Sequence, residues 1–150
     1  LVKYLIEESN AAKVTLDILK NSIDGQLSKY ITPDKKISFT INGSADAIPI
    51  RGTIPYKGEF GSEISENCDI EGDNKLLIIN SSTGISDNYT LAFLRSFAVR
   101  EYISQNNEKL KHTRNSFSHK ANVNSLRGGK FRRVSIEMTI HNAFENIGPN

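Results

Sequence analysis

Two segments of this chain alternate strictly between apolar and polar residues, and this pattern constrains the fold more than any other feature. They span residues 37–43 and 133–140, and their apolar positions are Ile37, Phe39, Ile41, Val134, Ile136, Met138 and Ile140. A period of two predicts β-strands with one side in a core and the other in solvent. The two strands therefore predict a sheet that is covered on one face, and they are expected to pair with each other.

Two amphipathic patterns supply helices to cover that face. Within residues 10–30, apolar residues recur every three or four positions, and Asn10 can cap the first turn. The stretch "DNYTLAFLRSFAVREYI", residues 87–103, has the same period and a broader apolar face, and Asp87 or Asn88 can cap it. Helices on one face of a sheet predict an α+β fold, a two-layer sandwich with a mixed sheet in βαβαβ order. The short segment 1–7 would be a first strand or a frayed end.

Residues from about 47 to 86 separate the first strand pattern from the second helix. They are rich in Gly, Asn, Ser and Asp, and they contain short strand-like pieces at 52–60 and 74–80. Their apolar content is too small for a separate core. We interpret them as a long inserted excursion in a single domain that spans residues 1–150. The polar stretch 104–130 shows no clear strand pattern.

Charge and hydropathy exclude several classes of partner. A net charge of +2, from 19 basic and 17 acidic residues, does not indicate nucleic acid, and the basic run 127–133 is interpreted as a solvated strand end. The longest apolar runs, such as residues 76–79, are far below the roughly 20 residues that cross a bilayer. Because the chain starts at Leu1, we expect an excerpt or a processed product, whose membrane anchor would lie in a segment absent from it.

The sequence offers little catalytic or metal chemistry. His112, His119 and His141 are scattered, and we interpret them as surface or packing residues rather than metal ligands. Cys68 is the only cysteine, so it forms no internal disulfide, and no histidine near it in sequence would activate its thiol. No nucleophile motif is present. We therefore expect no metal, no cofactor and no enzymatic activity.

Arg95 interrupts the apolar stripe of the second helix and is the residue that most needs an explanation. Asn88, Leu91, Arg95 and Val99 recur at spacings of three, four and four, so they share one side of the helix. One interpretation is that the Arg95 side chain extends to water or pairs with a carboxylate. The other is an anion site beside the helix N-terminus, where the guanidinium would bind a ligand carboxylate. Asp46, in the loop after the first strand, could then hold a ligand ammonium, and the pair would recognise a zwitterion.

Three blocks of the sequence resemble the OmpA-like peptidoglycan-binding domain family. The helix resembles the family signature N-x-x-L-S-x-x-R-A-x-x-V-x-x-x-L, with Ala92 and Ser96 in place of the usual Ser and Ala. The segment "INGSADA" resembles the family's G-H-T-D strand end, and "FRRVSIEM" resembles its closing N-R-R-V-E-I strand. The matching residues are Gly43, Asp46, Asn88, Leu91, Arg95, Val99, Ile103, Arg132, Arg133, Val134 and Ile136. The blocks stand in the family's order and cover about half the chain.

The resemblance implies a sandwich that binds the peptidoglycan stem peptide without covalent chemistry. In the family, the matching Asp and Arg bind diaminopimelate. The resemblance therefore implies that Asp46 and Arg95 bind this ligand. Asn88 and the backbone around Leu91 would complete the set of donors, and Arg133 would support Asp46 or a nearby carboxylate.

The resemblance also implies a cellular setting, and alternatives remain beside it. The parent protein would lie in the periplasm of a Gram-negative bacterium and anchor the outer membrane to the cell wall. If the parent is a stator protein like the wall-binding (MotB-like) subunit of the flagellar motor, the anchor is the inner membrane. Another hypothesis is that the domain keeps the fold but binds a protein partner through residues 47–86. An enzyme is the third and least favoured.

Overall fold

The computed structural model describes residues 10–128 and 133–142. Its helices and strands, in chain order, are α1 (Asn10–Asp24), β1 (Lys35–Ala45), β2 (Glu63–Ile70), β3 (Asp73–Asn80), α2 (Asn88–Asn106), β4 (Arg114–Val123) and β5 (Val134–Asn142). Short 3₁₀ helices, η2 (Ser28–Tyr30) and η3 (Glu108–His112), follow α1 and α2. Residues 1–7, interpreted above as a first strand or a frayed end, lie outside the described residues.

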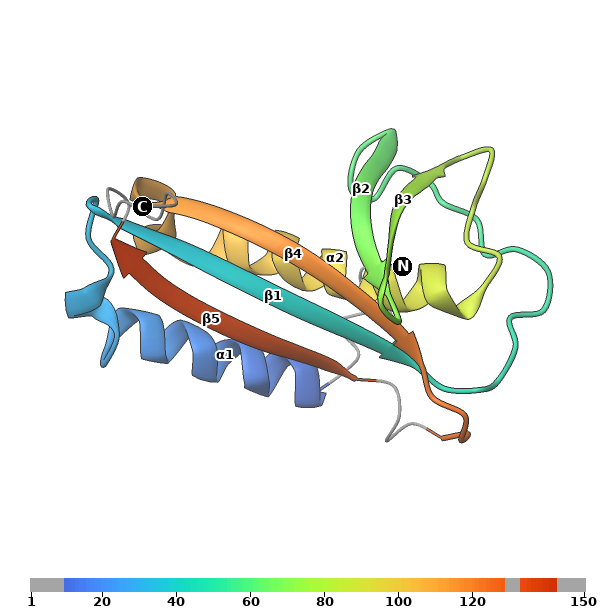
Figure 1. The fold of residues 1–150 in the computed structure, drawn as a ribbon, viewed down its shortest axis with the longest axis horizontal. Helices are drawn as coiled ribbons and strands as arrows, with labels where there is room; N and C mark the ends of the chain where they lie inside the picture. The colour runs from blue at the N-terminus through green and yellow to red at the C-terminus, as the bar shows by residue number, and fades with distance from the viewer. Residues whose placement is uncertain (1–9, 129–132, 143–150) are drawn as a thin grey trace, which may run out of the picture.

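The five strands form one mixed sheet in the order β3-β2-β4-β1-β5 (Figure 1). Strand β1 lies in the middle of its longer part, parallel to β4 and antiparallel to β5. The predicted pairing of the two alternating segments is therefore confirmed, with Ile37 opposite Ile140 and Ile41 opposite Ile136. The prediction of an α+β chain with a mixed sheet and two helices is also confirmed.

One face of β1 builds the core. Its buried and partly buried residues alternate from Ile37 to Ala45 as the sequence pattern predicts. Leu16 and Ile23 of α1 and residues of α2 belong to the same buried cluster as Ile37 and Phe39. Both helices therefore cover one face of the sheet (Figure 1).

Helix α1 is shorter than the periodicity predicted. It ends at Asp24, and the N–H of Gly25 donates to the carbonyl of Asn21 at 2.9 Å. Glycine is favoured just after a helix because it has no Cβ to hinder the turn. The apolar residues beyond Gly25 belong to a loop and to η2, which keep Leu27 packed against the core cluster.

Helix α2 begins where the sequence predicted. Asp87 is the N-cap, and its carboxylate accepts the N–H of Thr90 at 2.7 Å. The helix continues to Asn106, and its described buried residues include Phe93, Phe97 and Ile103. This element matches the prediction most closely because its cap, period and apolar face all agree.

The excursion is more ordered than the sequence suggested. Its second half is the β2–β3 hairpin, and β2 adds to the sheet in parallel with β4 (Figure 1). A second buried cluster lies beneath it, formed by residues of the hairpin, of the preceding loop and of the first half of α2, among them Tyr56, Ile64, Ile79 and Phe93.

Strand β4 falls within the stretch 104–130, where the sequence showed no clear strand pattern. Two residues on the buried face of β4 are His119 and Ala121, and the strand also carries Lys120 and several Ser and Asn residues. A histidine and an alanine weaken the apolar signal on which the prediction relied. The strand is held by its pairing with β1 along ten residues, from Lys36 opposite Arg114 to Ala45 opposite Val123.

Candidate functional site

A cleft of about 520 Å³ lies at the C-terminal end of β1. Its walls are the end of that strand, the loop of residues 46–62 and one side of the first half of α2. Pockets of roughly 300 to 1,000 Å³ accommodate small ligands. Four of the five residues that the sequence singled out line this cleft, namely Asp46, Asn88, Leu91 and Arg95.

Asp46 follows the last residue of β1 and is 4% exposed. Its Oδ1 accepts the N–H of Ile48 at 3.3 Å, and its Oδ2 accepts the N–H of Gly128 at 3.1 Å. These bonds fix the carboxylate between two loops. A carboxylate has about four acceptor sites for hydrogen bonds, so it can serve several donors at once.

Arg95 is half-buried, and its Nη1 donates to the carbonyl of Ser44 at 2.9 Å. This bond draws the guanidinium toward the end of β1, two residues before Asp46. A guanidinium has five N–H donors in a planar fork that fits a carboxylate. The structure thus brings the predicted cation and the predicted anion to one cleft.

Asn88 and Leu91 line the cleft, but the hydrogen-bond donors that the resemblance implies there, the Asn88 amide and the Leu91 N–H, bond within the chain. Both amide hydrogens of Asn88 are committed, because its Nδ2 donates to the carbonyls of Asp46 at 3.1 Å and Ile48 at 2.9 Å. The N–H of Leu91 donates to the carbonyl of Asp87 at 3.2 Å. Asn88 therefore ties the loop to the helix, and Leu91 contributes its side chain to the wall rather than an N–H to a ligand.

Arg133 does not line the cleft. Its side chain is exposed, and its backbone carbonyl accepts the N–H of Ser44 at 2.8 Å. Its contact with the site thus runs through the backbone of Ser44, the same residue of β1 whose carbonyl Arg95 contacts.

The loop of residues 46–62 supplies cleft residues that sequence reasoning did not single out. Ile48, Ile50 and Ile54 form an apolar wall, and Lys57 and Glu59 add one charge of each sign. The signal available in the sequence was the cluster of isoleucines in an otherwise polar excursion. Sequence alone gave no reason to place that cluster next to α2.

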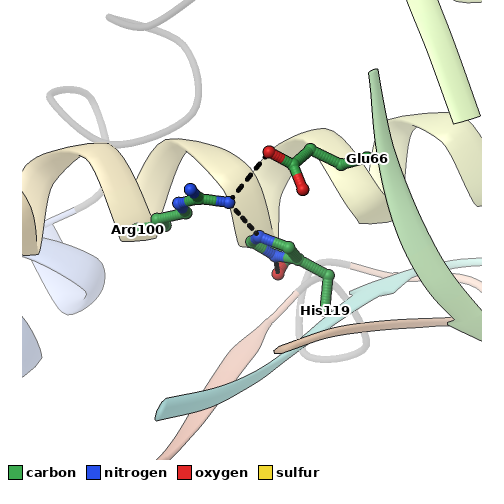
Figure 2. A network of polar contacts seen from close by, with 4 residues as sticks. Glu66, Arg100 and His119 are labelled. Atoms are coloured by element: carbon green, nitrogen blue, oxygen red, sulfur yellow. Dashed lines mark hydrogen bonds and ion pairs between the residues drawn. The ribbon is translucent and has the colours of Figure 1, made fainter. Parts of the chain in front are cut away.

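A second group of polar side chains lies between α2 and the sheet (Figure 2). Arg100 of α2 reaches Glu66 of β2 at 3.1 Å and Nε2 of His119 of β4 at 3.4 Å. The other ring nitrogen of His119, Nδ1, lies 2.5 Å from Oγ of Ser96, which donates to the carbonyl of Ile41 at 2.9 Å. This group, the Glu66–Arg100–His119–Ser96 network, links the hairpin, the helix and the middle of the sheet.

The partners of His119 determine where its proton lies. Since Ser96 donates its hydroxyl hydrogen to Ile41, its oxygen accepts from His119, which places the ring proton on Nδ1. Nε2 then accepts from Arg100. Burial, and secondarily the charge of Arg100, lowers the pKa of His119 to about 4. His119 is thus neutral near pH 7, and Ser96 is fully buried, which places the pair out of reach of a substrate.

The buried neutral His119 predicts that acid weakens the fold. The unfolded chain binds the proton at an ordinary histidine pKa near 6.5, and the folded chain only near 4, so stability is complete above pH 6.5 and is lost as the pH falls toward 4. We expect the free energy of unfolding to fall by about 2 kcal/mol between pH 7.5 and 5. Urea unfolding at both pH values measures it.

The matched control for this prediction is the exposed His112. His112→Gln should keep the full pH dependence of the free energy of unfolding. His119→Gln should be less stable at pH 7.5 and should lose most of that pH dependence. An NMR titration of the His119 ring in the unaltered chain reads the same pKa directly. A ring that titrates near 6.5, or a pH dependence unchanged in His119→Gln, would contradict the prediction.

The sequence raised three further questions, namely a reactive thiol, a metal site and a membrane span. Burial, and secondarily the charge of Asp69, raises the pKa of Cys68 to about 12, so this thiol is not a nucleophile at neutral pH. Residues 10–128 and 133–142 contain no group of three or more His, Cys, Asp or Glu placed to hold a metal ion. In the same ranges, no helix has both the length and the hydropathy to span a membrane.

Comparisons of the chain with models of protein families, with curated proteins and with solved structures found no match. The features of this chain that bear on its function are therefore the cleft and the motifs of the sequence.

Proposed function

We propose that this chain is a noncatalytic peptidoglycan-binding module with an OmpA-like fold, and that its cleft takes the diaminopimelate of the stem peptide. The observation that carries the proposal is the position of Asp46 and Arg95 in one cleft. They come from two sequence blocks that are separated by about forty residues. Both blocks resemble the same family, and the two residues that line this cleft are the ones that the resemblance pairs.

The chemistry of the ligand suits this pair. The side-chain end of meso-diaminopimelate carries an ammonium and a carboxylate on one carbon. Arg95 would bind the carboxylate through its planar fork, and Asp46, fixed by two backbone N–H groups, would accept the ammonium. The apolar wall that includes Ile48 and Leu91 would pack against the methylene chain. No step of this binding requires a bond to be made or broken.

The arrangement of the elements supports the same proposal. The order β1, α2, β5, preceded by α1, follows the order of the family blocks, and the first two blocks pack closely, because a Cβ on Gly43 would collide with the backbone of α2 at Ala92. The β2–β3 hairpin is an addition at the sheet edge and leaves the cleft in place. The parent protein would then be held at the cell wall in the periplasm, anchored to the outer or the inner membrane by a segment outside this chain.

An NMR titration with matched peptides tests the proposal. The peptides are L-Ala-γ-D-Glu-X-D-Ala, with meso-diaminopimelate or L-lysine as X, which differ only in the side-chain carboxylate. We expect the diaminopimelate peptide to shift the amide signals of residues 44–48 and 88–95, and the lysine peptide to bind much more weakly. No shift with either peptide, or equal affinity for both, would refute the proposal.

A second candidate function is favoured by one observation on the hairpin. Strand β3 is the edge of the sheet, and its Leu76 and Ile78 are 56% and 47% exposed. An exposed edge strand with apolar side chains is a common docking site for another protein. Under this alternative, residues 47–86 bind a partner and the cleft binds no diaminopimelate, so the same titration separates the two functions.

A further inference from the structure

The cleft carries two charged side chains for which the resemblance gives no role. Lys57 and Glu59 line it from the loop of residues 46–62, and Arg95 lines it from α2. Together with Asp46 and Arg95, they give the cleft two cationic and two anionic side chains, although a single zwitterion needs one of each.

The backbone that carries Lys57 is fixed on both sides. Ile54 and Ile85 exchange two backbone hydrogen bonds, at 2.8 and 2.9 Å, which bind the loop to the segment before α2. The Tyr56 side chain is buried, and its hydroxyl donates to the carbonyl of Gly61 at 2.6 Å and accepts the N–H of Phe60 at 3.0 Å. The cleft wall is thus held in place before any ligand arrives, which lowers the entropy cost of binding.

Lys57 and Glu59 differ in what they can offer a ligand. Glu59 is half-buried, and its Oε2 accepts the backbone N–H of Lys57 at 2.9 Å, a bond that closes the turn between them. The side chain of Lys57 is exposed and carries its charge on a flexible stem of four carbons. Glu59 therefore positions the turn, and Lys57 supplies a mobile cation at the wall of the cleft.

We infer that Lys57 binds a second carboxylate of the ligand whose zwitterion is held by Asp46 and Arg95. This inference rests on the proposed function. A stem tetrapeptide carries two further carboxylates besides the diaminopimelate side chain: the α-carboxylate of its γ-linked D-glutamate and the terminal carboxylate of D-alanine. The inserted loop thus makes the cleft selective for the acidic peptide over a free zwitterion.

Four peptides and three chains test the inference. The peptides are the diaminopimelate tetrapeptide, its D-glutamate α-amide, its C-terminal amide, and the lysine tetrapeptide as the control for the zwitterion site. The chains are the unaltered protein, Lys57→Gln, and Lys109→Gln, which removes an exposed lysine from η3. Dissociation constants come from NMR titrations at low and high salt.

We expect Lys57→Gln to bind the tetrapeptide about threefold to fivefold more weakly, as befits an exposed ion pair, and the difference to shrink at high salt. One of the two amidated peptides should bind the unaltered chain about threefold to fivefold more weakly than the tetrapeptide does. The same peptide should bind Lys57→Gln no more weakly than it binds the unaltered chain. That peptide identifies the carboxylate that Lys57 contacts. Lys109→Gln should bind like the unaltered chain.

The failure of the inference and the failure of the proposed function give different results. If the tetrapeptide binds and the lysine peptide does not, yet Lys57→Gln and both amides leave the affinity unchanged, the inference is wrong and the proposed function stands. If the unaltered chain binds neither the diaminopimelate nor the lysine peptide, both are wrong.

Discussion

Replacing Arg95 by glutamine is expected to weaken binding of the chain to purified peptidoglycan sacculi by roughly 30-fold or more. Removing one partner of a hydrogen-bonded charge pair costs on the order of 2 to 5 kcal/mol, and every 1.4 kcal/mol corresponds to about tenfold in affinity. Glutamine keeps much of the length of the side chain but loses the charge and the planar fork. Cosedimentation with sacculi over a range of concentrations measures the change.

Asp46→Asn is the companion variant and should lose binding to a similar degree. The substitution keeps the shape of the side chain but gives the ligand ammonium no negative charge. Since Asp46 also accepts two backbone N–H groups, its thermal unfolding must be measured beside its binding. Only a folded variant with lost binding supports the proposed role.

Arg114→Gln provides the matched control for charge. Arg114 is exposed at the start of β4, and β4 runs parallel to β1, so it lies at the end of the sheet opposite to the cleft. Its loss should leave binding to sacculi nearly unchanged. Equal loss in Arg114→Gln and Arg95→Gln would mean that net charge, not the cleft, attracts the chain to the wall, and equal binding by all variants would contradict the assigned site.

Gly43→Ala is expected to destabilise the fold by about 3 kcal/mol, at the upper end of the usual cost of overpacking. A Cβ at this position would lie 1.9 Å from the carbonyl oxygen of Ala92 and 2.9 Å from its carbonyl carbon. These are backbone atoms of α2, so no side-chain rotation can relieve the contact. The helix would have to move away from β1, which would also move Arg95 relative to Ser44. Urea unfolding measures the loss.

Gly72→Ala separates this steric effect from the cost of replacing a glycine as such. Gly72 has a φ of 97°, which strains an alanine, but nothing lies within 4 Å of a Cβ there. Its replacement should cost about 1 kcal/mol through backbone strain. If the two variants were equally stable, the close approach of α2 to β1 would not be the reason for a glycine at position 43.

The elements best predicted from the sequence are those in which local signals agree. Helix α2 has a capping Asp87, a helical period and a broad apolar face, and β1 and β5 alternate with a period of two. Each of these signals depends on residues within one turn or one strand. Strand β4 was missed because His119 faces the core, where the pattern calls for an apolar residue. That histidine is tolerated because Ser96 and Arg100 meet both of its ring nitrogens, and they come from α2, about twenty residues earlier.

The features of the candidate site also fall into two groups, those that the sequence indicates and those that only the tertiary structure shows. The sequence determined which residues are unusual. These are Arg95 in an apolar stripe, Gly43 near the end of a strand, and Asp46 just after that strand. Only the tertiary structure decided that Arg95 reaches the end of β1, that Asn88 ties the loop to the helix, and that Lys57 belongs to the same cleft. The reason is physical. Periodicity and capping follow from the geometry of neighbouring residues, whereas the cleft arises from contacts between β1, the loop and α2, which lie far apart along the chain and meet only when the core is packed.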